Sequence, residues 1–351
     1  MRNRISFMND YSESACYEIL KLLLETNHRQ YEGYGTDEIC EAAKECIYRE
    51  IGTKDAEIHF LMGGTQTNKT VIAASLRSYE AVIAVDTGHI NVHETGAIEN
   101  SGHKVVAVPG KDGKITPDEI EKAVLLHTDE HMVKPAMVYI SDATELGTVY
   151  SKAELTAISS VCKKHGLKLF LDGARLGSAL TSRGNDCTMK DLTEFCDVFY
   201  IGGTKNGALF GEAVVISNPE ISREFRYQIK QNGAMLAKGW VLGIQFLGLF
   251  RDQTFYQLAE HANQMADRIR QCLKRQKMDL LVETETNQIF VILEDEKLKC
   301  LEEEFAFTFW EKTDDTHTAV RIVTSWDTKE EHVDKLIQAL EKRKYQENMC
   351  E

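Results

Sequence analysis

The chain has 351 residues, 43% of them hydrophobic and 27% charged, which is enough to bury a large core and to form two lobes. Its formal net charge of −14 disfavours nucleic acid and anionic membrane as partners, because both are polyanions. No apolar run approaches the roughly 20 residues of a membrane span, and the first four residues lack the apolar core of a signal peptide. The nine scattered cysteines contain no C-x-x-C pair, which favours reduced thiols in a cytoplasm.

Residues 1–30 predict an N-terminal arm followed by a helix. After a loop rich in glycine and tyrosine, Thr36 is expected to cap a second helix that ends at Gly52. Strands and helices then alternate. The expected strands span residues 57–62, 81–85, 104–108, 136–140, 168–171, 198–201 and 213–216. The repeated strand–helix order predicts an α/β domain with a mainly parallel sheet and helices on both faces.

The pattern changes beyond about Gly239. The elements expected there are two helices, over 240–250 and from 254 to about 277, two strands over 288–293 and 319–323, and a closing helix from Thr328. This order indicates a separate α+β unit. We therefore predict three parts: an arm and helix over 1–30, a large domain over 31–238, and a smaller C-terminal domain over 239–351.

Lys205 follows a strongly apolar stretch, 196–201, that is expected to be a buried strand ending at a glycine pair. Burial there disfavours an ammonium, so the lysine is expected to be neutral or covalently occupied. An earlier apolar strand ends in Asp172. Taken singly, Lys205 is a loop lysine and Asp172 a helix cap. Taken together, they match pyridoxal phosphate (PLP), which takes a lysine for its Schiff base and an acid for its pyridinium nitrogen.

The glycine turn Gly63-Gly64-Thr65-Gln66 lies between an expected strand and an expected helix. Glycines there let the backbone approach a phosphate, whose charge the free N–H groups of the helix favour. Taken alone the turn is an ordinary strand–helix connection, because it is neither a Walker loop nor G-x-G-x-x-G.

His89 and His93 are four residues apart, but Ile90 replaces the glutamate of a zincin motif and no third ligand is evident, so no metal site is predicted. His89 is a candidate for stacking on a planar cofactor, and the alternative is a capping or surface histidine. Arg321 lies in an apolar strand, where an arginine is expected to seek a carboxylate.

Three segments, 171–176, 204–207 and 321–324, together resemble the threonine aldolases, which belong to the β-eliminating-lyase branch of the fold-type I PLP enzymes. The resemblance runs from about Asn9 to about Asp327. It implies an aspartate aminotransferase-like large domain and cleavage of the Cα–Cβ bond of a β-hydroxy-α-amino acid, of the L-threonine or L-allo-threonine type, to glycine and an aldehyde. It also implies a homodimer or homotetramer with sites completed across the interface.

The resemblance also assigns the cofactor site. Lys205 matches the lysine that forms the Schiff base, Asp172 the partner of the pyridinium nitrogen, and His89 the histidine that stacks on the ring. Arg175 is expected to lie beside the cofactor as well. The residues expected to hold the cofactor phosphate are Gly64, Thr65 and Gln66.

For the substrate, Arg175 and Arg321 match the arginines that hold the amino-acid carboxylate, with Asn9 from the arm. His131 matches a second family histidine, near the substrate hydroxyl; outside the resemblance, it is an exposed residue in a polar loop. The base that takes the hydroxyl proton is expected to be His89 or His131, because a histidine titrates near neutral pH.

The chain departs from the family pattern at several positions. Asn9 stands where a serine is usual, Asn206 where a glycine is usual, and residues 141–145 replace a segment like E-N-T-H-N. Two alternatives therefore stay open. One is a PLP enzyme of another type, such as a β-eliminating lyase or an aminotransferase, and the other is a fold relative that binds PLP without aldol cleavage.

Overall fold

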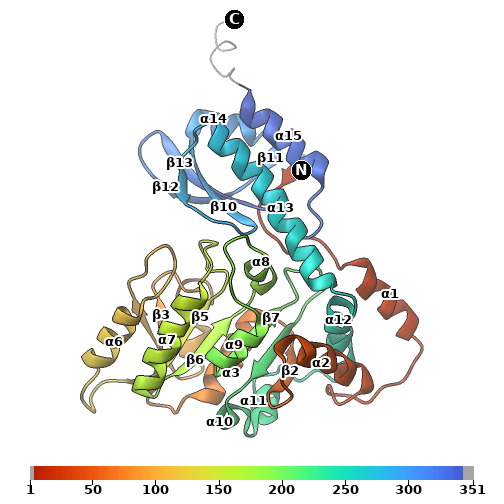
Figure 1. The fold of residues 1–351 in the computed structure, drawn as a ribbon, viewed down its shortest axis with the longest axis vertical. Helices are drawn as coiled ribbons and strands as arrows, with labels where there is room; N and C mark the ends of the chain where they lie inside the picture. The colour runs from red at the N-terminus through yellow and green to blue at the C-terminus, as the bar shows by residue number, and fades with distance from the viewer. Residues whose placement is uncertain (1–3, 343–351) are drawn as a thin grey trace, which may run out of the picture.

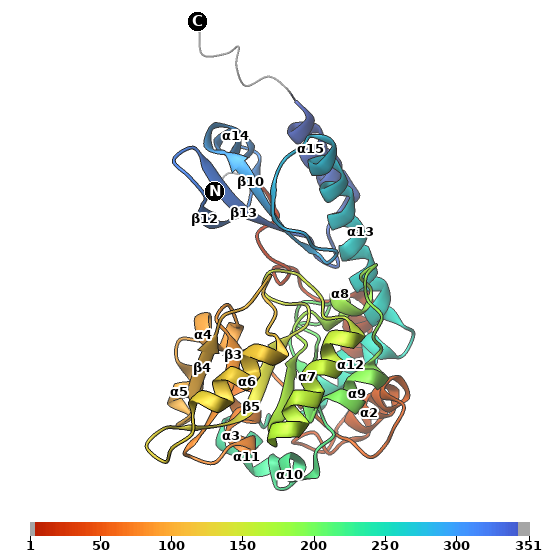
Figure 2. The same ribbon diagram turned by 60° about the vertical axis from the view of Figure 1, so that its left-hand side comes forward.

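The computed structural model describes residues 4–342, and Figure 1 shows two units joined by the long helix α13 (Thr254–Arg275). The large unit contains a seven-stranded sheet, and the small unit contains a four-stranded sheet. Figure 2 shows the small unit beyond one edge of the large sheet, with the N-terminal arm passing between the two. Within residues 4–342 no helix is both long and apolar enough to cross a bilayer.

The strands of the large sheet run in the order β2-β8-β7-β6-β5-β3-β4. They are β2 (Glu57–Leu61), β3 (Glu80–Val85), β4 (Lys104–Val108), β5 (Lys134–Ser141), β6 (Lys168–Asp172), β7 (Val198–Gly202) and β8 (Glu212–Ile216). The predicted α/β class and mainly parallel sheet are confirmed. Strand β8 alone runs opposite to the other six, because it returns from β7 through a short turn instead of a helical crossover.

Helices cover both faces of this sheet, because successive strand residues point to opposite sides. One face carries α1 (Tyr17–Thr26), α2 (Glu38–Ile51), α6 (Pro117–Leu126), α7 (Lys152–His165), α8 (Leu176–Leu180), α9 (Met189–Phe195) and α12 (Trp240–Phe250). The other face carries α3 (Gly64–Ser75), α4 (His89–Val92), α5 (Ala97–Asn100), α10 (Pro219–Ser222) and α11 (Phe225–Gln231). Helix α2 ends at Gly52 as expected, but Asp37 caps it in place of Thr36, since the Asp37 carboxylate accepts from the Ile39 and Cys40 N–H groups.

The small unit is an antiparallel sheet of order β12-β13-β10-β9. Its elements are β9 (Leu280–Val282), β10 (Gln288–Glu294), α14 (Asp295–Leu301), β12 (Thr308–Lys312), β13 (His317–Val323) and α15 (Glu330–Glu341). The two central strands were expected, whereas the outer strands and α14 were not. The closing helix begins at Glu330 instead of Thr328.

The packing divides the chain differently from the expected boundaries. In the arm, β1 (Ile5–Ser6) pairs with β11 (Phe305–Ala306), and Phe7 lies in the core of the small unit. Helix α12 packs into the core of the large unit. The change between the units therefore falls within α13, whose later turns join the core of the small unit.

The parallel strands end at one edge of the large sheet, which faces the small unit. Ser141 at the end of β5 is paired with Asp172 at the end of β6. The small unit reaches this edge through Thr286, whose hydroxyl donates to the Gly147 carbonyl at 2.7 Å. In open α/β sheets ligands bind at this carboxyl edge, so a ligand site is expected there.

Candidate active site

A cavity of about 290 Å³ opens at the carboxyl edge of the large sheet. It brings together three features that the sequence singled out, namely the glycine turn, Asp172 and Lys205. A second cavity of about 300 Å³ adjoins it and extends to Arg321 in the small unit. The residues that line both are Tyr11, His89, Glu145, Arg175 and Lys205. We call the two cavities together the cleft.

Lys205 lies in the turn between β7 and β8 and lines both cavities. Burial lowers the pKa of its amine because an ammonium is poorly solvated there, and the positive charge of Arg175 lowers it further. Both effects favour the neutral amine over the ammonium, although the nearby carboxylates Asp10 and Asp172 act in the opposite direction.

Asp172 is only 4% exposed and is held by four donors. The hydroxyls of Tyr139 and Tyr200 each donate to it at 2.5 Å, the Asn68 amide at 3.1 Å and the Ala174 N–H at 2.9 Å. Burial by itself raises the pKa of this carboxyl, but the tyrosine hydrogen bonds, together with the charge of His89 and the Ala174 N–H, outweigh it, so the pKa of Asp172 is lowered. The cleft thus contains a fixed carboxylate anion.

His89 is connected to Asp172 through a chain of hydrogen bonds. Its Nδ1 lies 2.8 Å from a carboxylate oxygen of Glu94, and that oxygen accepts from the Asn68 amide at 2.7 Å. Because the carboxylate accepts, Nδ1 carries a proton, and Nε2 is the ring nitrogen that does not contact Glu94. The Glu145 carboxylate accepts from the backbone N–H of His89 at 2.9 Å. The segment 141–145, which departs from the family pattern, therefore also helps to position this histidine.

The glycine turn leads into α3, so the N–H groups of Gly64, Thr65 and Gln66 lie in the first turn of a twelve-residue helix. Such groups have no partner within the helix and favour an anion. A Cβ at Gly64 would lie 3.2 Å from the Tyr200 hydroxyl, so glycine keeps this part of the cavity open. The turn and Lys205 fit a phosphorylated aldehyde that reacts with an amine.

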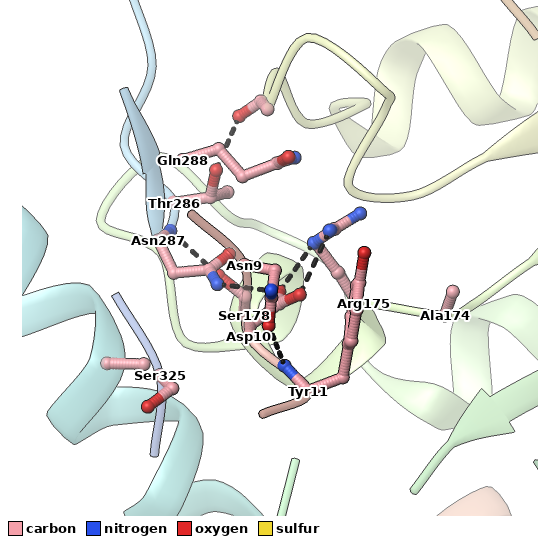
Figure 3. Close-up of polar contacts among 12 residues, drawn as sticks. Asn9, Asp10, Tyr11, Ala174, Arg175, Ser178, Thr286, Asn287, Gln288 and Ser325 are labelled. Atoms are coloured by element: carbon pink, nitrogen blue, oxygen red, sulfur yellow. Dashed lines mark hydrogen bonds and ion pairs between the residues drawn. The ribbon is translucent and has the colours of Figure 1, made fainter. Parts of the chain in front are cut away.

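The arm contributes Asp10, which the sequence did not predict as a site residue. Figure 3 shows this carboxylate between Arg175 and Asn287. It accepts from Arg175 Nε at 2.7 Å and Nη2 at 3.1 Å, and from the Asn287 amide at 3.0 Å. Burial opposes ionisation of Asp10, but the charge of Arg175 prevails and the pKa of this carboxyl is lowered. The arm and both units therefore meet at one buried ion pair.

Arg321 lies on β13, and its guanidinium is 6.0 Å from the centre of the Trp310 ring. Its one hydrogen bond within the described chain is a 3.5 Å contact with Gln288, and its buried Nε has no partner there. Burial lowers the pKa of Arg321, with the charge of Arg175 adding to the effect. An arginine so short of acceptors is suited to a carboxylate that enters the cleft.

Three predicted site residues do not line the cleft. His131 is exposed and precedes β5, whose eight residues span roughly 25 Å, so it lies at the far end of that strand from Ser141. Within a single chain His131 therefore lies away from the cleft, and the prediction that it acts as the base is not supported. The Asn9 side chain accepts from the Tyr11 N–H and the Ser12 hydroxyl, and that of Gln66 accepts from the Met62 N–H.

The chain is similar in sequence and in fold to known proteins. The family model for β-eliminating lyases matches residues 18–296. A low-specificity L-threonine aldolase of Pseudomonas sp. (strain NCIMB 10558) is 33% identical over 335 residues, 94% of this chain and 95% of the relative. A Leishmania major threonine aldolase structure is 46% identical, with a TM-score of 0.95, over 96% of this chain and 98% of that one. A putative L-allo-threonine aldolase structure from Listeria monocytogenes, 16% identical with a TM-score of 0.72 over 96% and 95% of the two chains, shares the fold.

The fold and the matched length define a β-eliminating lyase of fold-type I. The chain belongs to this family and, within it, to the threonine aldolases, as its segments 171–176, 204–207 and 321–324 predicted.

Proposed function

We propose that the protein is a PLP-dependent aldehyde-lyase that cleaves an L-threonine or L-allo-threonine type of amino acid to glycine and an aldehyde. The threonine aldolase family membership supports this reaction. The observation that carries it is the placement of Lys205, Asp172 and the glycine turn around one cavity of about 290 Å³.

The family and fold imply PLP, which when bound supplies an electron sink for a bond broken at Cα. Lys205 would attach it covalently, and the Asp172 carboxylate would face its ring nitrogen. The phosphate would be bound by the N–H groups of Gly64 and Thr65, and His89 would stack on the ring. Asp172 suits this role because its four hydrogen bonds keep it both ionised and fixed.

The arginines would orient the substrate. Arg321 has unused donors and would bind the amino-acid carboxylate. Arg175 already donates two hydrogen bonds to Asp10, so it would act mainly as a fixed positive charge beside Lys205. Holding the carboxylate fixes which bond at Cα lies in position to break.

His89 would take the proton of the substrate hydroxyl at Nε2, since Glu94 occupies Nδ1. Loss of that proton lets the β-carbon leave as an aldehyde. Of the two histidines expected from the sequence, His89 is the one in the cleft.

A product assay tests this proposal against the other PLP reactions. Purified protein with PLP should release acetaldehyde and glycine from L-threonine or L-allo-threonine, and Lys205→Ala should abolish the release. Ammonia with a keto acid would indicate elimination, and amino transfer to an added keto acid would indicate an aminotransferase. A protein that binds PLP but changes no amino acid would be a fold relative without turnover.

A homodimer or homotetramer remains part of the proposal. Helix α1 leaves Tyr17 71% and Leu24 79% exposed, and such apolar surface favours an interface with a second copy. Light scattering of the purified protein would measure the assembly. A cytoplasmic location stays a prediction, for which the support is that the eight described cysteines form no disulfide.

A further inference from the structure

Glu212, the first residue of β8, is 3% exposed and was not singled out by the sequence. It is paired with Leu61 at the end of β2 and with Gly202 at the end of β7. The chain continues from β2 into the glycine turn and from β7 to Lys205. The Glu212 carboxyl therefore lies between the two segments assigned to the phosphate and to the reactive amine.

One oxygen of this carboxyl is occupied and the other is not. Oε1 accepts from the Thr204 hydroxyl at 2.9 Å, and the Thr204 oxygen in turn accepts from the Gly211 N–H at 3.0 Å. Oε2 is buried and has no hydrogen-bond partner within residues 4–342. A buried polar atom without a partner is costly, so a partner is expected when the site is complete. Glu212 lines the cavity together with Gly63, Gly64 and Thr65. A ligand bound at the glycine turn would therefore lie close to the Glu212 carboxyl.

Burial favours the protonated form of Glu212, although the hydrogen bond from Thr204 and the positive charge of Lys205 oppose it. The titratable groups that face it are Lys205, Asp172 and Tyr200. The residues that line this cavity from the β2 and α3 side, 62–65 and Asn68, carry no titratable group. Burial is the main cause that raises the pKa of Glu212 to about 8, and the negative charge of Asp172 adds to it. Near neutral pH the carboxyl can therefore donate a hydrogen bond, whereas its ionised form would repel an anion.

We propose that Glu212 is a phosphate-binding residue of the cofactor site, donating a hydrogen bond from its protonated carboxyl to the phosphate of PLP. The inference rests on the proposed function, since it assumes that PLP is the cofactor. A hydrogen bond from a titrating carboxyl makes retention of the cofactor depend on pH. As the pH rises through about 8, the donor is lost, a negative charge appears beside the phosphate, and affinity falls.

The test is the dissociation constant of PLP and of pyridoxal for the apoprotein, measured by fluorescence quenching from pH 7 to 9.5. A phosphate monoester has its second pKa near 6, so the phosphate itself does not change charge in this range. Ionisation of Lys205 affects both ligands and cancels in the ratio of their constants, and the ionisation of the free ligands is the same for the wild type and for every variant. For the wild type, the preference for PLP over pyridoxal should fall about tenfold for each pH unit above about 8.

Glu212→Gln is the matched variant, because its amide keeps an acceptor for Thr204 and supplies a donor that does not titrate. Its preference for PLP should stay constant with pH. Glu145→Gln removes another carboxyl that lines the same cavity, and there the wild-type fall should persist. Parallel curves for the wild type and Glu212→Gln, or a constant wild-type ratio, would overturn the inference. Failure of the wild type to bind PLP even at pH 7 would instead overturn the proposed function.

Discussion

Asp10→Asn should destabilise the protein by removing one charge of a buried ion pair. The side chains of Asp10 and Arg175 are 1% and 12% exposed, and two nitrogen–oxygen contacts of 2.7 and 3.1 Å join them. Breaking a buried pair by removing one partner costs roughly 3–5 kcal/mol, because the other charge is left uncompensated. Arg175 borders the cleft and keeps some access to water, so we expect about 3 kcal/mol.

The loss should depend on pH in a defined direction. The folded state lowers the pKa of Asp10 below its ordinary value of 3.8. Its contribution to stability is therefore complete above about pH 4 and is lost as the pH falls through the folded value. Since Asp10 also raises the pKa of Lys205, its replacement should lower the pKa of that amine further.

Urea unfolding at pH 7 of the wild type and of Asp10→Asn measures the predicted difference, provided that both transitions have the same slope. Glu25→Gln is the control, since Glu25 forms a 4.0 Å ion pair with Lys21 in which both side chains are more than half exposed. Such surface pairs contribute about 0–1 kcal/mol. If Asp10→Asn costs no more than this control, the pair is solvated in solution and the proposed junction between the arm and the two units is refuted.

Three further changes probe the cleft. Lys205→Ala should lower the rate of cleavage by at least roughly 10³-fold and remove the visible absorption band of bound PLP that borohydride bleaches; a surviving band would refute the covalent role. Tyr139→Phe removes one of the hydrogen bonds that lower the pKa of Asp172, so the acidic limb of the pH–rate profile should move to higher pH, and an unchanged limb would contradict the role of that bond. Arg321→Gln should raise KM about 10–100-fold, because a hydrogen bond to a charged group is worth roughly 1.5–3 kcal/mol; a fall confined to kcat would place the substrate carboxylate elsewhere.

The large sheet could be predicted because its strands are short apolar runs with turn residues between them, a signal that requires no knowledge of distant parts of the chain. Lys205 and Asp172 were found in the same way, as polar residues at the ends of such runs. The expected domain boundary at residue 238 differs from the packing, which places α12 in the core of the large unit. Helix α12 is apolar all round, which shows that it is buried but not in which core.

His131 shows what parallel-sheet geometry adds to a motif. A residue that precedes a parallel strand lies at its amino end, whereas Asp172 ends its strand and lies at the carboxyl edge. The position of His131 before an expected strand already conflicted with a role beside Asp172. Asp10 had no comparable signal, because its partners Arg175 and Asn287 are far from it in sequence and meet it only when the arm crosses between the two units.

The pKa values of Asp172 and Glu212 are shifted in opposite directions within one cavity, because the groups around the two carboxyls differ. Asp172 and Glu212 are 4% and 3% exposed, so burial disfavours ionisation of both to a similar degree. Asp172 accepts four hydrogen bonds from Tyr139, Tyr200, Asn68 and Ala174, and its pKa is lowered. At Glu212 the Thr204 hydroxyl, the charge of Lys205 and the backbone of Gly203 lower the pKa, but burial prevails and the pKa is raised to about 8. The cavity can therefore present an anion to a protonated ring nitrogen and, on another strand, a neutral donor to a phosphate, because at similar burial the hydrogen bonds and neighbouring charges decide which carboxyl keeps its charge.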